Sequence, residues 1–298
     1  MSDLSRAVPA RSSQRSRRGA GLPRHSLSST AVAAVLAVVA VLLSVVVSAE
    51  PAQAAVGVSS TRTVSGFPRW FEDAGGTRLE PCFENDPARC VLLADAGFDP
   101  AQPLVFPTNF PGEFFYSIVD SDVINTPGCQ GTRPGKALVR LALEGAFAGG
   151  SPVPGDQMVF ARTRVTATGL CPNAAYTFTH PYGRVTLTTD VDGQLARNQA
   201  TTDIGCIAGG CTFTEPLTAQ MFRGFLRWDP AVAPAATPGY LSGDAGVLHP
   251  IVGASGTGSA NLFRVSGPSF TASTNLFTVA AKVAGPLHST PEAADFGN

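Results

Sequence analysis

The sequence predicts a mainly β protein that folds as an antiparallel β-sandwich. Short runs of alternating apolar and polar residues recur along the chain, which is the pattern of strands with one buried face. The 31 Gly and 24 Pro residues that punctuate these runs are typical of turns. The 298 residues are 44% apolar, which suffices for a sizeable core and excludes a wholly disordered chain.

Residues 1–54 have the pattern of an export signal. Six arginines between Arg6 and Arg24 precede an apolar run at 31–49, and the small-x-small sequence Ala52-Gln53-Ala54 follows. We expect a signal peptide that is cleaved after Ala54. The alternative is an uncleaved membrane anchor at 31–49, because 19 apolar residues approach the about 20 that span a bilayer. Either way, the residues beyond 55 lie outside the cytoplasm, and secretion is the expected outcome.

The exported part is mildly acidic. The leader holds six arginines and two acids, so 15 basic and 20 acidic residues remain, with a net charge of −5. This charge gives no reason to expect binding to nucleic acid or to anionic lipid. Contact with a membrane is expected only if the leader is uncleaved.

All six cysteines follow residue 54, and an even number in an oxidising compartment predicts disulfides. Two pairs are close in sequence. Cys82 and Cys90 enclose a turn-prone loop, and Cys206 and Cys211 enclose a loop with two glycines. Cys129 and Cys171 then remain as a long-range pair. No C-x-x-C motif occurs and no His lies near either short pair, which argues against zinc.

Residues 66–285 are expected to form one β-rich domain, or two closely packed β modules, between a flexible lead-in at 55–65 and a flexible tail at 286–298. In the clearest strand, 157–168, Val159, Ala161, Thr163 and Val165 share one face. Similar runs predict further strands at 175–179, 184–191, 261–265 and 275–283.

Two segments are less clear. Residues 136–148 fit a strand, with Val139, Leu141 and Leu143 alternating with polar residues, but Leu138 and Phe147 could also share a helix face. We expect a strand there. Residues 231–239 are rich in Pro and Ala, which predicts a loop within the domain or a boundary.

The segment from Leu170 through Pro172 to Tyr176 has the spacing L-x-P-x-x-x-Y. It resembles the tyrosine corner of fibronectin type III and immunoglobulin-like sandwiches. That resemblance implies an immunoglobulin-like sandwich, in which the Tyr hydroxyl bonds back to the chain that crosses between the sheets. Cys171 departs from the family pattern, and the chain is longer than one such module.

Six further segments stand out for their density of aromatic, Gly, Pro and Asp residues: GFPRWF at 66–71, NFPGEFFY at 109–116, GDQMVFAR at 155–162, THPYG at 179–183, DIGC at 203–206 and WDP at 228–230. Together they resemble an uncharacterised group of exported proteins from high-GC Gram-positive bacteria. The resemblance implies a shared exported domain over most of 66–285 and brings no known activity or catalytic residues.

Four aromatic or imidazole side chains are candidates for ligand binding. His180 and Tyr182 lie in a Thr-His-Pro-Tyr-Gly turn motif, where an imidazole and a phenol could form a small binding surface. The plainer interpretation, which we favour, is a hairpin turn in which His180 caps a backbone group. Trp70 and Trp228 lie in Pro- and Gly-rich contexts and could stack on sugar rings, although core packing is the commoner role.

Catalytic signatures are absent from the sequence. It has no G-x-S-x-G and no H-E-x-x-H motif, and no metal or cofactor site is expected. Asp156, Asp203 and Asp229 lie in dense motifs, but turn or cap roles are commoner for such residues. We therefore expect a secreted, non-enzymatic binding or structural module whose partner is a glycan or a cell-wall surface. The alternative is a secreted carbohydrate-active hydrolase with paired carboxylates near Asp156 or Asp229.

Overall fold

The computed structural model describes residues 55–95, 97–130, 132–254 and 260–285. They belong to a compact unit that spans Gln53–Asn298. The expected signal peptide or anchor at 1–54 and the tail at 286–298 lie outside the described residues. Within the described ranges, no helix is long and apolar enough to cross a membrane.

In the described part of the chain, the regular secondary structure consists of β-strands and two short 3₁₀ helices. The predominance of strands agrees with the alternating sequence pattern. The larger sheet follows the strand order β1-β2-β3-β15-β4-β6-β7-β10, with β5, β11 and β12 joined to its side, and every pairing is antiparallel. Its strands are β1 (Gly57–Val58), β2 (Phe71–Glu72), β3 (Arg78–Glu80), β4 (Glu113–Ser121), β5 (Ile124–Thr126), β6 (Gly135–Phe147), β7 (Gln157–Ala167), β10 (Thr201–Gly205), β11 (Arg227–Trp228), β12 (His249–Val252) and β15 (Leu276–Val283).

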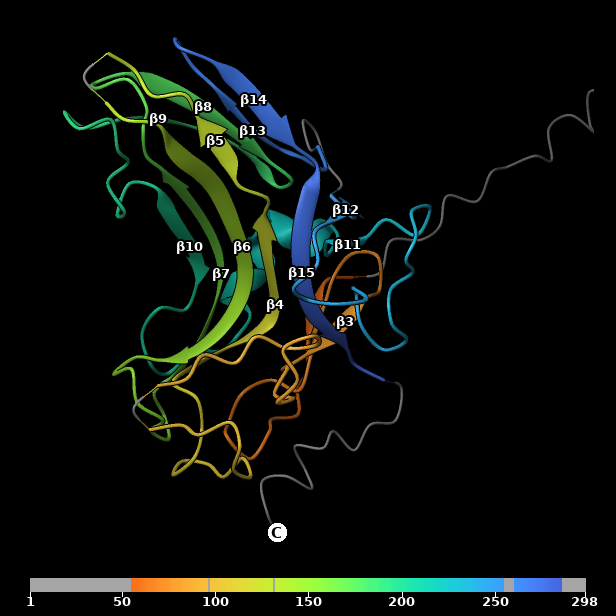
Figure 1. The fold of residues 1–298 in the computed structure, drawn as a ribbon. Helices are drawn as coiled ribbons and strands as arrows, with labels where there is room; N and C mark the ends of the chain where they lie inside the picture. The colour runs from red at the N-terminus through yellow and green to blue at the C-terminus, as the bar shows by residue number, and fades with distance from the viewer. Residues whose placement is uncertain (1–54, 96, 131, 255–259, 286–298) are drawn as a thin grey trace, which may run out of the picture. The chain divides into compact units, whose positions relative to one another are not determined.

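The smaller sheet has the order β14-β13-β8-β9. Its strands are β8 (Ala175–His180), β9 (Gly183–Thr188), β13 (Phe263–Ser266) and β14 (Thr271–Thr274). Figure 1 shows this sheet lying across one end of the curled β6–β7 region of the larger sheet. Phe178 and Val265 from the smaller sheet share a buried core with Val139 and Val165 from the larger one, so the expected mainly β sandwich is confirmed.

Strand β6 settles the ambiguity at 136–148 in favour of a strand. Val139, Leu141 and Leu143 point into the core, whereas Arg140 and Glu144 lie at the alternate positions. The strand pairs with β7 over its length, from Ala137 opposite Ala167 to Phe147 opposite Gln157. This long register fixes which residues of the two strands face each other.

The chain crosses from the larger to the smaller sheet between β7 and β8, where the Leu170–Tyr176 motif lies. The Cys171 backbone N–H donates to the Tyr176 hydroxyl at 3.0 Å, and the same hydroxyl lies 2.7 Å from the Ser269 hydroxyl. The Tyr176 hydroxyl therefore ties the crossover to the turn between β13 and β14. The tyrosine-corner resemblance and the immunoglobulin-like type of the sandwich stay predictions.

The three disulfides pair the cysteines as the spacing predicts. Cys82–Cys90 and Cys206–Cys211 close short loops, and Cys129–Cys171 joins residues 42 positions apart. The long bridge encloses β6 and β7. Disulfides persist in oxidising surroundings, so the three bridges indicate an oxidising, extracellular environment.

The N-terminal segment differs from the expected flexible lead-in at 55–65. Gly57 and Val58 form β1, which pairs with β2, and Ser59, Thr63 and Ser65 are buried. Two-residue strands have no measurable periodicity, so the sequence pattern could not reveal this one. The Pro- and Ala-rich stretch at 231–239 is a loop within the same unit.

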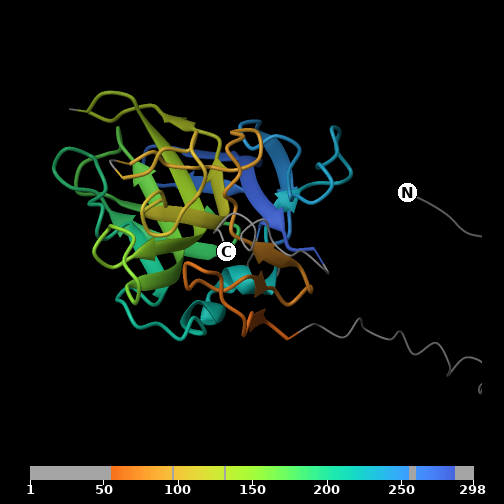
Figure 2. The ribbon, with the colours of Figure 1, turned by 90° about the horizontal axis from the view of Figure 1, so that it is seen from below.

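Two 3₁₀ helices, η1 (Glu215–Thr218) and η2 (Gln220–Arg223), lie beside the N-terminal strands (Figure 2). The ring of Phe222 packs 5.9 Å from that of Phe71, and the Asp73 carboxylate accepts the Phe225 N–H at 2.7 Å. These contacts hold η2 in place at one end of the cavity described next.

Candidate functional site

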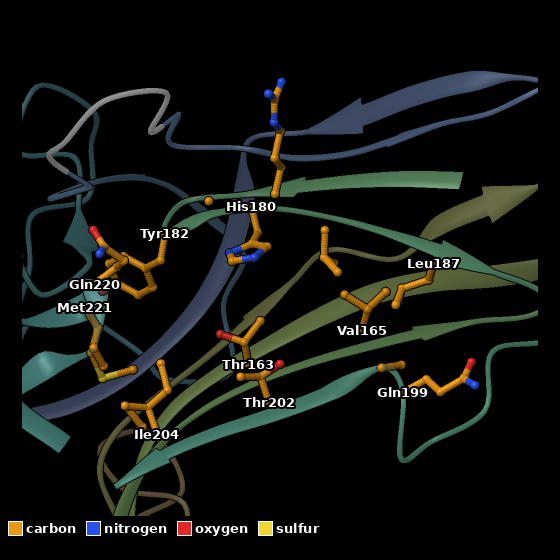
Figure 3. Close-up of a pocket in the computed structure, with 16 residues that line it drawn as sticks. Thr163, Val165, His180, Tyr182, Leu187, Gln199, Thr202, Ile204, Gln220 and Met221 are labelled. Carbon is orange, nitrogen blue, oxygen red and sulfur yellow. The ribbon is translucent and has the colours of Figure 1, made fainter. Parts of the chain in front are cut away.

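A cavity of about 320 Å³ lies between the two sheets. Strands β7 and β10 form one wall, the β8–β9 hairpin forms the other, and η2 closes one end (Figure 3). Strands β9 and β10 are both end strands of their sheets, so the cavity lies at an open edge of the sandwich. Its lining consists of Ala161, Thr163, Val165, His180, Tyr182, Gly183, Arg184, Val185, Leu187, Gln199, Ala200, Thr202, Ile204, Ala219, Gln220 and Met221.

Strand alternation places these side chains. Ala161, Thr163 and Val165 are on the core-facing side of β7, as the sequence predicts, and they are small enough to leave space above the sheet. Val185 and Leu187 project from β9 across the cavity, and the alternate residues Thr186 and Thr188 are exposed. The result is a mainly apolar lining with a few polar groups, which is typical of small-molecule sites.

His180 is the polar centre of the cavity. Its side chain is 6% exposed, and Figure 3 shows the imidazole pointing from the hairpin toward Thr163 and Thr202. Its Nδ1 atom is buried and has no hydrogen-bond partner among the described residues. Burial lowers the pKa of His180 to about 4, so the ring is neutral at pH 7. A neutral imidazole can donate or accept a hydrogen bond.

Tyr182 anchors the hairpin. Its hydroxyl donates to the Gly224 carbonyl at 3.2 Å, which ties the β8–β9 turn to the end of η2. Burial raises the pKa of this phenol, so it stays protonated and can donate. The ring therefore lines the cavity while the hydroxyl is already engaged.

The sequence-predicted set is only partly brought together. His180 and Tyr182 both line the cavity, and the expected hairpin is formed by β8 and β9. The prediction that His180 caps a backbone group is wrong as far as Nδ1 is concerned, because this atom has no hydrogen-bond partner among the described residues. Trp228 is 3% exposed and stacks on His249 with ring centroids 4.2 Å apart, so it packs in the core, which is the role that the sequence favours, and offers no exposed platform. Trp70 is half-buried and lies outside the lining, with the Arg78 guanidinium 4.3 Å from its ring centroid.

The three acids singled out in the sequence do not converge. The Asp229 carboxylate accepts a hydrogen bond from the Ala231 N–H. Asp156 lies in a turn, where its own backbone N–H donates to the Val153 carbonyl. Asp203 has a different role from the expected turn or cap. It lies in β10 and forms a two-point ion pair with Arg162, at 2.8 and 2.9 Å.

Arg162 organises a separate acidic group, which we call the Arg162 cluster: Arg162, Glu113, Glu144 and Asp203. The guanidinium contacts Glu144 at 2.9 and 3.1 Å and lies 3.8 Å from Glu113. Three acids therefore surround one cation on the face of the larger sheet opposite the core. This group could not be recognised from the sequence, because its members come from four different strands, β4, β6, β7 and β10.

One acid of the Arg162 cluster retains a proton at neutral pH. Burial, together with the hydrogen bond and charge of Glu113, raises the pKa of Glu144 from 4.5 to about 9. Between pH 4.5 and about 9, the folded state therefore binds more protons than the unfolded state, so the free energy of unfolding falls as the pH rises through this range.

We expect the free energy of unfolding to fall as the pH rises between about 5 and 9 on account of Glu144, by at most about 1 kcal/mol per pH unit. Glu144→Gln should flatten this slope, because the amide stays neutral. Urea denaturation at several pH values measures it, with Glu72→Gln, at an ion pair outside the cluster, as the control. Equal slopes for Glu144→Gln and the native chain would contradict the assignment.

No protein-family model, no curated protein and no solved structure matches the chain. Across the described ranges, no group of three or more His, Cys, Asp or Glu side chains is placed to hold a metal ion.

Proposed function

We propose that the chain is an exported, non-enzymatic binding module that holds a small, mainly apolar molecule with one polar group in the cavity between its sheets. The observation that carries this proposal is the neutral, largely buried imidazole of His180, which lines the cavity and whose Nδ1 has no partner among the described residues. A buried polar atom without a partner costs about 1–3 kcal/mol. A ligand that supplies the missing hydrogen bond removes this cost.

The lining supports an apolar body for this ligand. Val165, Leu187, Ile204 and Met221 surround the polar centre, and a volume of about 320 Å³ lies at the small end of the range for ligand pockets. A glycan receives less support here, because its many hydroxyls need more partners than this lining offers. The disulfides support a location outside the cytoplasm.

A hydrolase receives less support than a binding module. The cavity lining contains no Asp, Glu, Ser or Cys, so His180 has no acid partner there to orient it as a base toward the hydroxyl of Thr163 or Thr202. The acids of the Arg162 cluster are bound to one guanidinium, and the Glu144 side chain is 3% exposed. A substrate would have to displace that ion pair to reach it.

The proposal is tested with N-phenyl-1-naphthylamine, a neutral fluorescent probe with an apolar body and one N–H group. Residues 55–298 should enhance its fluorescence. Thr202→Phe, which fills the cavity from an exposed position on end strand β10, should abolish the enhancement. The matched control is Thr186→Phe, the same change at an exposed threonine of β9 outside the lining, which should bind as the native chain does.

The role of His180 has its own variant. His180→Phe keeps the apolar bulk but removes Nδ1, so the affinity for the probe should fall about five- to tenfold, the equivalent of one hydrogen bond. Affinity of the native chain should be constant from pH 6 to 8, because His180 remains neutral there. Equal binding by the Thr202→Phe and Thr186→Phe variants would refute the site.

A further inference from the structure

A second cavity, of about 420 Å³, lies at the end of the larger sheet where β6, β7 and the segment before β10 meet. Its side chains from β6 and β7 alternate with the core residues Val139 and Val165, so it opens mainly on the sheet face opposite the core. We call it the arginine pocket. It is lined by Leu138, Arg140, Arg164, Thr166, Leu195 and Arg197, with Val165 between them.

The strand register forces two of these arginines together. Arg140 on β6 is directly opposite Arg164 on β7. Like charges at opposite positions repel, so this pairing is unfavourable unless something neutralises it. Asp120 neutralises Arg140 through two hydrogen bonds of 2.8 and 2.7 Å.

Arg164 and Arg197 have no such acid. The Arg164 Nε donates to the Thr201 hydroxyl at 3.0 Å, and neither guanidinium forms an ion pair with any described residue. Asp203 acts on Arg164 through its charge, but this carboxylate is held by Arg162. Burial and the nearby charges of Arg162 and Arg197 lower the pKa of Arg164, which agrees with an excess of positive charge.

We propose that the arginine pocket binds a phosphate group, either free or as part of a phosphate monoester. Two uncompensated guanidinium groups match the charge of a dianion, and their planar N–H donors suit the oxygens of phosphate. The cavity has room beyond a phosphate, and Leu138 and Leu195 provide apolar contacts for an ester's carbon chain. This site is independent of the apolar cavity proposed above.

Calorimetric titration of residues 55–298 with inorganic phosphate, glycerol phosphate and acetate tests the proposal. The titrations use one ionic strength, because salt screens exposed charges. They use a pH of about 8, where phosphate is mainly a dianion. We expect phosphate or its ester to bind and acetate, with one charge, to bind at least tenfold more weakly. Tighter binding of glycerol phosphate identifies a monoester site, and equal or tighter binding of inorganic phosphate identifies a free-phosphate site.

Arg164→Gln and Arg197→Gln should each weaken binding of the phosphate probe about tenfold or more. Arg197 is exposed outside the strands, so its replacement leaves the fold intact even if Arg164→Gln impairs folding. Arg264→Gln, at an exposed position on β13, is the matched control and should bind as the native chain does. Unchanged affinity in Arg197→Gln, acetate binding as tight as phosphate, or no binding at millimolar phosphate would overturn the proposal.

Discussion

A Cys129→Ser/Cys171→Ser variant is expected to lose about 4 kcal/mol of unfolding free energy, because the bridge closes a loop of 42 residues in the unfolded chain. The bridge also joins the segment after β5 to the crossover between the sheets, and it encloses the two longest strands, β6 and β7. Its loss therefore frees the unfolded chain and loosens the junction at which the Tyr176 hydroxyl is bound. Urea denaturation of residues 55–298 measures the effect.

The matched control is Cys206→Ser/Cys211→Ser, which opens a loop of only five residues. Its expected loss is about 2 kcal/mol, since loop-closure entropy grows with the logarithm of loop length. Both variants remove one bridge and two sulfurs, so the difference between them reports loop length and position. A loss in the first variant no larger than in the second would show that the long bridge does not restrain the unfolded chain.

Local pattern was enough to predict the strands with long alternation. The segment at 157–168 contains β7, and 275–283 contains β15, because each places apolar residues on one face over many positions. Strands β1 and β2 were missed, since two residues carry no period. The pairing of the cysteines was also predictable, because two short loops left one long-range partner.

The candidate site was predictable only where it is local. His180 and Tyr182 lie within one turn motif, and both line the cavity. Thr202 and Met221 could not be placed, because strand pairing and the docking of η2 bring them there from separate segments. For Trp228, the sequence favoured a position in the core but could not identify its neighbour. His249 lies over the indole because β11 pairs with β12.

The Arg162 cluster was also unpredictable from local pattern, and its loss has a larger effect on the free energy of unfolding. Arg162 could be assigned to the outer face of its strand, but its three acids depend on the register of β6, β7 and β10 with their neighbours. Arg162→Gln should therefore be severely destabilising, by about 3–5 kcal/mol, because it removes the two-point ion pair with Asp203 and the hydrogen bonds to the buried oxygens of Glu144. Thermal and urea denaturation measure the loss.

Arg140→Gln is the matched control for Arg162→Gln. Arg140 lies on the same sheet face and also forms a two-point ion pair, but with a single acid, and both side chains are about one-third exposed. Its loss should cost about 1 kcal/mol or less, because water stabilises the remaining carboxylate. If the two arginines proved equally dispensable at pH 8, Arg162 would not be the charge that holds these four strands in register.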